Sequence, residues 1–214
     1  MNDLNFYYLE HTTPPHAWLL ELYGLRKKVF ADRLSWKVNV RNGIELDEYD
    51  TDQTVYIVGT RNGLPLASLR LINTLKPYML EGPFQDFFDY KPPKNCLIAE
   101  SSRFFVDKIR SRALGLANMP LTEMLLLSMH NYAVSVGVKS IITVVSRAMA
   151  RIVRTAGWQY NILASGETSE GEKLLLLDMP VTCQNHQQLL VGITKKFPIP
   201  YAEISHWPLP VVVN

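Results

Sequence analysis

The sequence predicts a mixed α/β sandwich, in which helices cover a mostly antiparallel central sheet. Two apolar segments, Val55–Thr60 and Pro65–Asn73, flank Asn62-Gly63, a dipeptide that favours a type I′ turn and therefore a β-hairpin. After a third apolar segment, Cys96–Val106, helical and strand patterns alternate, which is typical of βαβ units. A meander followed by βαβ units indicates a mixed sheet.

Apolar periodicity defines the elements of the first half. Asn5–Leu9 is predicted to be a short strand, and apolar residues at helical spacing predict an amphipathic helix over about His16–Asp32. An acidic loop is expected over Arg33–Gln53. Lys76–Lys94 is rich in proline and aromatic residues and is expected to be irregular, with one short helix near Phe84–Phe88.

Helix caps organise the second half. Pro120 suits the first turn of a helix that runs to about Val136. Ser146 is predicted to be the N-cap of a helix over Arg147–Ala156, which Gly157 ends. The other expected elements are strands at Ser140–Val145, Trp158–Ala164 and Lys173–Leu177, a short helix at Gln184–Leu190, and a last strand near Ala202–Ser205.

Composition limits the classes of function. The chain has 214 residues, of which 47% are hydrophobic and 20% are charged, so one domain spanning residues 1–214 is expected. A net charge of +2 is too small to indicate nucleic-acid binding, and no apolar run approaches the ~18 residues of a membrane span. The cysteines and histidines lack metal-ligand spacing, and the N-terminus lacks a signal-peptide pattern. We therefore expect a cytoplasmic monomer that binds neither metal, nucleic acid nor membrane.

Charged residues inside apolar segments mark a candidate site. Glu100 and Arg103 lie in a predicted buried strand, where unpaired charges are costly. Strict alternation places them on opposite faces of that strand, but a β-bulge at Ser101-Ser102 would turn both toward one cleft. The alternative interpretation is a structural ion pair between Glu100 and Arg70 on a neighbouring strand.

The acidic loop contains two aspartates, Asp47 and Asp50. By themselves they favour a solvated loop, and a calcium loop is disfavoured because its glycine and terminal glutamate are missing. Together with Arg26, Phe30 and Trp36 they suggest a site for a small zwitterion. Carboxylates attract an ammonium group, aromatic faces attract a soft cation, and arginine binds a carboxylate.

Two further basic features suggest contacts with an anionic partner or cofactor. Arg147, Arg151 and Arg154 share one helical face, which is either solvated or a docking patch for an acidic partner. Arg112-Ala-Leu-Gly-Leu-Ala117 matches the turn by which acetyltransferases hold the pyrophosphate of coenzyme A, although the next helix starts only at Pro120.

Five separated blocks of the sequence resemble the acyl-homoserine lactone (autoinducer) synthase family, the makers of quorum-sensing signals. They are Arg26-x3-Phe30-x5-Trp36, Asp47-Glu-Tyr-Asp50, Ser-Leu-Arg70, Glu100-Ser-Ser-Arg103-Phe-Phe-Val-Asp and Val-Ser-Arg-Ala-Met149. The blocks run from about residue 20 to 160 and fill all eight signature positions of the family. The resemblance implies an acetyltransferase-like (GNAT-like) three-layer sandwich.

The resemblance also implies a two-step reaction without a cofactor. An acyl group on the phosphopantetheine of acyl carrier protein passes to the amine of S-adenosylmethionine, and lactonisation then releases methylthioadenosine. Glu100 is the expected general base, or it orients the amine. Arg26 and Arg103 would hold the methionyl carboxylate or brace the acidic loop. Phe30 and Trp36 would cover the sulfonium.

Further residues have expected roles in that reaction. Arg70 would support Glu100 or Asp47. The slot for the acyl chain is assigned to Ser101, Phe104, Leu126, Met129, Thr143, Val145 and Met149, with ordinary core packing as the alternative for each apolar member. In the resembled family a threonine at the position of Thr143 accompanies 3-oxoacyl products, which implies a short chain such as 3-oxohexanoyl. The face of Arg147, Arg151 and Arg154 would receive the acidic carrier protein.

Two other functions stay open. An N-acetyltransferase of the same fold that uses acetyl-coenzyme A would explain the Arg112–Ala117 turn, but it leaves Arg26, Phe30 and Trp36 without a shared task. A non-catalytic module that binds S-adenosylmethionine is the second alternative.

Overall fold

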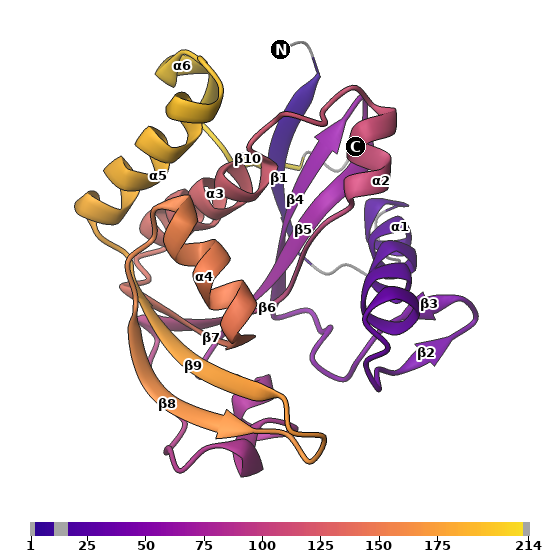
Figure 1. Cartoon of the computed structure of the whole chain (residues 1–214), viewed down its shortest axis with the longest axis vertical. Helices are drawn as coiled ribbons and strands as arrows, with labels where there is room; N and C mark the ends of the chain where they lie inside the picture. Colours follow the sequence, from indigo (N-terminus) through magenta and orange to yellow (C-terminus); the bar gives the residue numbers. More distant parts are fainter. Residues whose placement is uncertain (1–2, 11–16, 212–214) are drawn as a thin grey trace.

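An eight-stranded mixed sheet forms the centre of the molecule (Figure 1), in a computed structural model that describes residues 3–10 and 17–211. The strand order is β10-β1-β4-β5-β6-β7-β9-β8, with β1–β10 and β6–β7 parallel and the other neighbours antiparallel. The strands are β1 (Leu4–Glu10), β4 (Thr54–Arg61), β5 (Leu64–Asn73), β6 (Ile98–Val106), β7 (Ser140–Ser146), β8 (Asn161–Glu167), β9 (Lys173–Pro180) and β10 (Leu209–Pro210).

Helices lie on both faces of this sheet, so the predicted three-layer α/β sandwich is confirmed. The helices are α1 (Ala17–Arg26), α2 (Lys108–Ala113), α3 (Leu121–Ser135), α4 (Arg147–Ala156), α5 (Cys183–Lys196) and α6 (Tyr201–Ile204). The π-helical turn η1 (Lys27–Arg33) continues α1, and η2 (Met79–Glu81) and η3 (Gln85–Phe87) are short 3₁₀ turns. A separate two-stranded hairpin joins β2 (Val40–Arg41) to β3 (Ile44–Glu45).

The core divides into three clusters that follow these layers. The largest packs α3, α4 and α5 against one face of the sheet and includes Trp158. On the opposite face, α1 and η1 cover the N-terminal strands, around Phe30. The segment that carries η2 and η3 covers the other half of that face, around Tyr78. Within the described residues, no helix has the length and apolar content needed to cross a bilayer.

Local sequence signals explain several element boundaries. Asn62 and Gly63 have φ of 53° and 74°, as a type I′ hairpin turn between β4 and β5 requires. The Ser146 hydroxyl accepts a hydrogen bond from the Met149 N–H at 3.2 Å and caps α4, as predicted. Gly157 ends α4 with φ of 109°, a left-handed conformation that favours glycine.

Other predicted elements differ from the structure. The strand predicted at Ala202–Ser205 is wrong, because Pro200 starts the helix α6 there, and the last strand is instead β10. The Asp107 carboxylate accepts hydrogen bonds from the N–H groups of Ile109 and Arg110, both at 3.0 Å, and thereby starts α2, which was not predicted. His16, the predicted start of the first helix, lies outside the described residues.

Three further boundaries are shifted. The predicted acidic loop contains the hairpin β2–β3. The strand predicted from Trp158 starts only at Asn161, since Trp158 is fully buried in the core cluster and donates to the Pro180 carbonyl at 3.0 Å. The predicted short C-terminal helix extends over the whole of α5.

Replacement of Gly157 by alanine should destabilise the fold more than the same change at Gly137. Both glycines have positive φ, but a Cβ at Gly157 would lie 2.6 Å from the Gln188 carbonyl oxygen, whereas a Cβ at Gly137 meets no atom within 4 Å. We expect Gly137→Ala to cost about 1 kcal/mol of unfolding free energy and Gly157→Ala about 1–3 kcal/mol more. Urea unfolding measures both, and equal losses would contradict the importance of this contact with α5.

Candidate active site

The candidate site lies where β6 and β7 stop pairing. Their parallel register joins residues 98–100 to residues 140–142, although both strands continue beyond this point. The last link between them is the Thr143 hydroxyl, which donates to the Ser101 carbonyl at 2.9 Å. The two strands therefore open a gap in the sheet ladder, with the face of α1 on one side and the face of α3 on the other.

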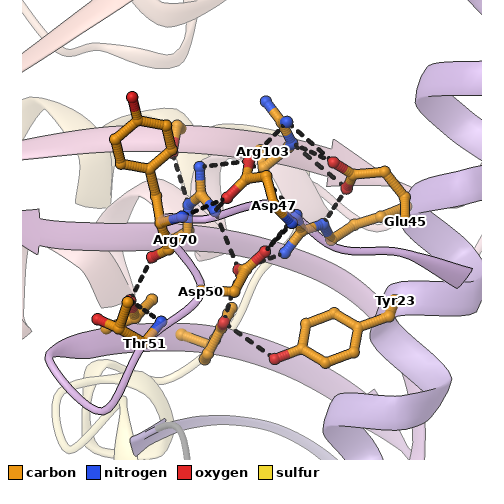
Figure 2. Close-up of polar contacts among 12 residues, drawn as sticks. Tyr23, Glu45, Asp47, Asp50, Thr51, Arg70 and Arg103 are labelled. Atoms are coloured by element: carbon orange, nitrogen blue, oxygen red, sulfur yellow. Dashed lines mark hydrogen bonds and ion pairs between the residues drawn. The ribbon is translucent and has the colours of Figure 1, made fainter. Parts of the chain in front are cut away.

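On the α1 face, six ionised side chains form a buried charge cluster (Figure 2), which comprises Arg26, Arg70, Arg103, Glu45, Asp47 and Asp50. Arg26 is 2% exposed and grips Asp50 with two hydrogen bonds of 2.7 and 2.9 Å, while its Nε donates to Glu45. Although burial opposes ionisation, Arg26 and Arg70 hold the pKa of Asp50 well below its usual range. Three positive and three negative charges make the cluster formally neutral.

The other two arginines connect the strands to the acidic segment. Arg70 of β5 binds Asp47, and also lies 3.0 Å from both Asp50 Oδ1 and the Ser102 hydroxyl. Arg103 donates to Asp47 at 2.7 Å and to Glu45 at 2.9 Å. The interpretation of the acidic segment as a solvated loop is therefore wrong, because arginines from three elements draw its carboxylates into the interior.

The bulge on β6 occurs later than predicted. Ser101 and Ser102 pair regularly with β5, and the register shifts only between Ser102 and Phe105. Arg103 takes up the extra residue with φ of 54°, a left-handed conformation that costs about 1–2 kcal/mol for a non-glycine residue. The predicted position at Ser101-Ser102 is wrong, and the ion pairs of Arg103 give the physical reason for the site of the bulge.

Glu100 lies apart from the charge cluster, with its own partners. It is 2% exposed, and its two carboxylate oxygens accept hydrogen bonds from the backbone N–H groups of Met79 and Leu80, both at 2.9 Å. Burial raises the pKa of Glu100 to about 7, against the opposing effect of these two hydrogen bonds. The alternative ion pair with Arg70 is replaced by the contacts of Arg70 with Asp47 and Asp50.

Met79 links Glu100 to the arginines. Its sulfur lies 3.1 Å from a guanidinium nitrogen of Arg70 and 3.6 Å from one of Arg103. Glu100 and Arg103 therefore both contact Met79, which places their side chains on the same side of the sheet.

Two stacked aromatic rings border the cluster. The rings of Phe30 and Trp36 are 5.2 Å apart and 24° from parallel. Phe30 is buried and its ring lies 5.5 Å from the Arg103 guanidinium, whereas Trp36 is 45% exposed. Beside them, an exposed ion pair of 2.9 Å joins Lys37 to Glu170 in the turn between β8 and β9. The exposed ring of Trp36 therefore lies next to the charge cluster, which is formally neutral.

The residues predicted for the acyl slot lie on the α3 face of the sheet or at its edge. Leu126 and Met129 are fully buried in the main core cluster, as the core interpretation expects. Phe104, Val145 and Met149 are half-buried and pack against that cluster. Thr143 and Ser101, which are buried, face each other across the separating strands.

The three arginines predicted for docking are exposed on α4 but do not act alike. Arg151 lines a cavity of about 620 Å³, together with Lys108 and Arg112 of α2 and the start of α3. Arg154 instead lies over the ring of Tyr160, with 4.4 Å between its guanidinium carbon and the ring centre.

Sequence reasoning missed several members of the site. Glu45 is fully buried and bridges Arg26 and Arg103, yet only its position in the acidic stretch pointed to it. Tyr56 donates to Asp50 at 2.7 Å, and its hydroxyl lies 3.1 Å from that of Tyr23. These tyrosines looked like ordinary apolar positions of a helix and a strand.

Removal of one charge from the cluster should destabilise the protein strongly. Arg26→Met keeps an unbranched side chain but removes the guanidinium and leaves Glu45 and Asp50 buried without this partner, and we expect a loss of about 3–5 kcal/mol of unfolding free energy. The neighbouring change Lys27→Met, which breaks an exposed ion pair with Asp32, should cost at most about 0.5 kcal/mol. Similar urea midpoints for the two variants would contradict a structural role for the cluster.

Comparisons with known proteins identify the family of the chain. A family model described as "Autoinducer synthase" matches residues 10–189. An acyl-homoserine-lactone synthase of Pseudomonas amygdali pv. tabaci is 56% identical over 213 residues, which cover 100% of this chain and 94% of that protein.

Two solved structures extend the comparison to the fold. A coenzyme A-dependent acyl-homoserine lactone synthase, BjaI, with S-adenosylmethionine and isopentyl-coenzyme A, has a TM-score of 0.79 at 18% identity, over 99% of this chain and 95% of that one. A putative N-acetyltransferase from Lactobacillus plantarum has a TM-score of 0.55 at 19% identity, over 85% and 100%. The chain belongs to the autoinducer synthase family and is an acyltransferase, an acyl-homoserine-lactone synthase.

Proposed function

We propose that this synthase transfers a short 3-oxoacyl group from acyl carrier protein to the amine of S-adenosylmethionine and then closes the lactone with release of methylthioadenosine. The observation that carries the proposal is the buried Glu100 carboxylate, with a pKa of about 7, at the point where β6 and β7 separate. The neighbouring cluster is neutral within itself, and we assign the proton transfer to Glu100.

Glu100 is the proposed general base of the acylation step. The amine of the acceptor is protonated in water and must lose a proton before it attacks the thioester. Each Glu100 oxygen accepts one backbone hydrogen bond and keeps a second lone pair for that proton. A base whose pKa lies near the working pH suits this transfer. The unpaired edges of β6 and β7 offer backbone N–H groups to the thioester oxyanion.

The stacked rings of Phe30 and Trp36 are the proposed binding site of the sulfonium. The exposed face of Trp36 attracts a soft cation, with about 0.5–2 kcal/mol of stabilisation. Arg26 and Arg70 are buried and occupied by carboxylates, so we assign them, with Asp50, to the wall of the site. Arg103 and Asp47 are the least buried members of the cluster, and we assign them to its substrate-facing edge.

Lactonisation requires no protein nucleophile. The methionyl carboxylate attacks the carbon next to the sulfonium within the same molecule, and methylthioadenosine leaves with the bonding electron pair. The site therefore only has to hold the substrate in a bent conformation, which the wall beside Phe30 and Trp36 would favour.

The donor is proposed to enter from the side of α2 and α4. The cavity there has a volume typical of ligand sites and is lined by Arg151 and Arg112, which suit the phosphate of a phosphopantetheine arm. The thioester would pass the end of β6, and the chain would extend past Ser101, Phe104 and Thr143. Arg147 and Arg154, with Arg151, form the face of α4 assigned to the acidic carrier protein.

Product analysis tests this proposal against its alternatives. The protein is incubated with S-adenosylmethionine and either 3-oxohexanoyl-carrier protein or acyl-coenzyme A. Methylthioadenosine and an acyl-homoserine lactone, with the carrier thioester as the better donor, are the expected products. Better turnover of the coenzyme A thioester would overturn the donor assignment. Acetylation of other amines without methylthioadenosine would support an N-acetyltransferase, and binding without turnover a non-catalytic module.

Replacement of Glu100 by glutamine should cut turnover by about 10²–10⁴-fold, because the general base is lost. In the wild type, kcat/KM should rise as the pH rises through about 7, since Glu100 accepts a proton only when it is deprotonated. Glu100→Gln should lose this limb of the pH profile, while the exposed control Glu172→Gln keeps it. A wild-type profile that is flat between pH 6 and 8 would remove Glu100 from the role of base.

Replacement of Thr143 by valine should weaken the preference for 3-oxoacyl donors. The hydroxyl proton now points to the Ser101 carbonyl, and it would turn to the 3-oxo group of a bound chain. Loss of one neutral hydrogen bond corresponds to about 0.5–1.5 kcal/mol, so the ratio of kcat/KM for 3-oxohexanoyl over hexanoyl donors should fall about 2- to 10-fold. Thr60→Val, in another buried strand, is the control. An unchanged ratio in Thr143→Val would exclude the hydroxyl from chain recognition.

A further inference from the structure

Positive charge is concentrated in one stretch of the chain. Residues 108–156 contain seven lysines and arginines and one acidic residue, Glu123, which gives this stretch a net charge of +6. The whole chain carries only +2, so the remaining residues are net negative. The basic stretch comprises α2, α3, β7 and α4, and it supplies most of the wall of the 620 Å³ cavity, which Val106 and Lys196 complete. Such an asymmetry favours an acidic partner on this side of the molecule.

The cavity has two basic rims on different helices. Lys108 and Arg112 line it from α2, and Arg151 lines it from α4. All three side chains are exposed. Arg110, the other basic residue of α2, is instead held by Glu21 and by the Pro65 carbonyl, so it does not share this role.

Each rim also carries an exposed apolar side chain. Ile109 of α2 is 81% exposed, and Ile152 of α4 is 46% exposed. Single exposed aliphatic side chains are common on protein surfaces, but these two lie on the two helices that line one cavity, where they offer apolar contacts to a docked partner. Arg154 is less available to a partner than Arg151, because its guanidinium already lies over the ring of Tyr160.

We propose that α2 supplies half of the docking surface for the carrier protein, so that the acidic carrier straddles the cavity between α2 and α4. Lys108 and Arg112 meet its acidic residues, Ile109 and Ile152 meet its apolar positions, and its phosphopantetheine arm enters the cavity between them. The inference rests on the proposed function, since it concerns the same acyl donor, but it assigns docking to a helix that the family resemblance does not include.

Charge reversal on α2 tests this surface. Lys108→Glu, which leaves the phosphate contact assigned to Arg112 intact, should raise the KM for hexanoyl-carrier protein about five-fold or more, with kcat little changed, because rim charges act on encounter and docking. The KM for hexanoyl-N-acetylcysteamine, a truncated thioester without protein or phosphate, should change far less. Ile109→Asp should act in the same direction as the reversal.

A matched control separates docking from net charge. Lys91→Glu changes the charge by the same amount as Lys108→Glu, at an exposed position outside the basic stretch that does not line the cavity, and should leave the KM for carrier protein within about two-fold. Arg154→Glu should have a smaller effect than the α2 reversal. Equal effects of Lys108→Glu and Lys91→Glu on the KM for carrier protein, or equal effects of Lys108→Glu on both donors, would overturn the proposal.

Direct binding keeps the test independent of turnover. The Kd of the wild type for the carrier protein should weaken with salt, and the α2 reversal should weaken it about five-fold at low salt. A wild type that binds the carrier protein but turns over no donor with S-adenosylmethionine would contradict the proposed function alone. An unchanged Kd in the α2 variant would contradict the docking surface alone.

Discussion

The buried charge cluster is the interaction on which the rest of the structure depends. Three guanidinium groups from α1, β5 and β6 neutralise three carboxylates from one short segment, and most of these side chains are almost fully buried. Each partner is costly to bury alone, so the six must assemble together. The same contacts hold Arg103 in a left-handed conformation and bring the segment of Asp47 against the sheet.

Neutralisation within the cluster explains how a polar site can favour a cationic substrate. A wall with excess positive charge would repel a sulfonium, and a wall with excess negative charge would leave buried carboxylates unpaired. With the charges balanced, Trp36 and Glu100 are the groups that we propose to distinguish one ligand from another. The separation of β6 from β7 lies between this polar face and the apolar layer under α3, to which we assign the two halves of the proposed reaction.

Local patterns predicted most of the fold, because caps and turns depend on few residues. Ser146 begins α4 and Asn62-Gly63 closes its hairpin, as expected. The position of the bulge was missed because ion pairs distant in sequence, and not the Ser-Ser dipeptide, stabilise it. The burial of Glu45 and the contacts of Met79 were missed for the same reason, because their partners lie in segments that are far apart in the sequence. Family resemblance located every member of the cluster except Glu45, and it left open whether the arginines bind the substrate or the acidic loop.

Calorimetric titration with S-adenosylmethionine and with S-adenosylhomocysteine, its analogue with an uncharged sulfur, tests the central claim most directly. The two ligands share the adenosyl and amino acid groups and differ mainly in the sulfonium that Trp36 is proposed to cover. A cation–aromatic contact is worth about 0.5–2 kcal/mol, so S-adenosylmethionine should bind about 2- to 30-fold more tightly than S-adenosylhomocysteine. Equal affinities, or tighter binding of the uncharged analogue, would contradict the claim that Trp36, beside a neutral charge cluster, binds the sulfonium.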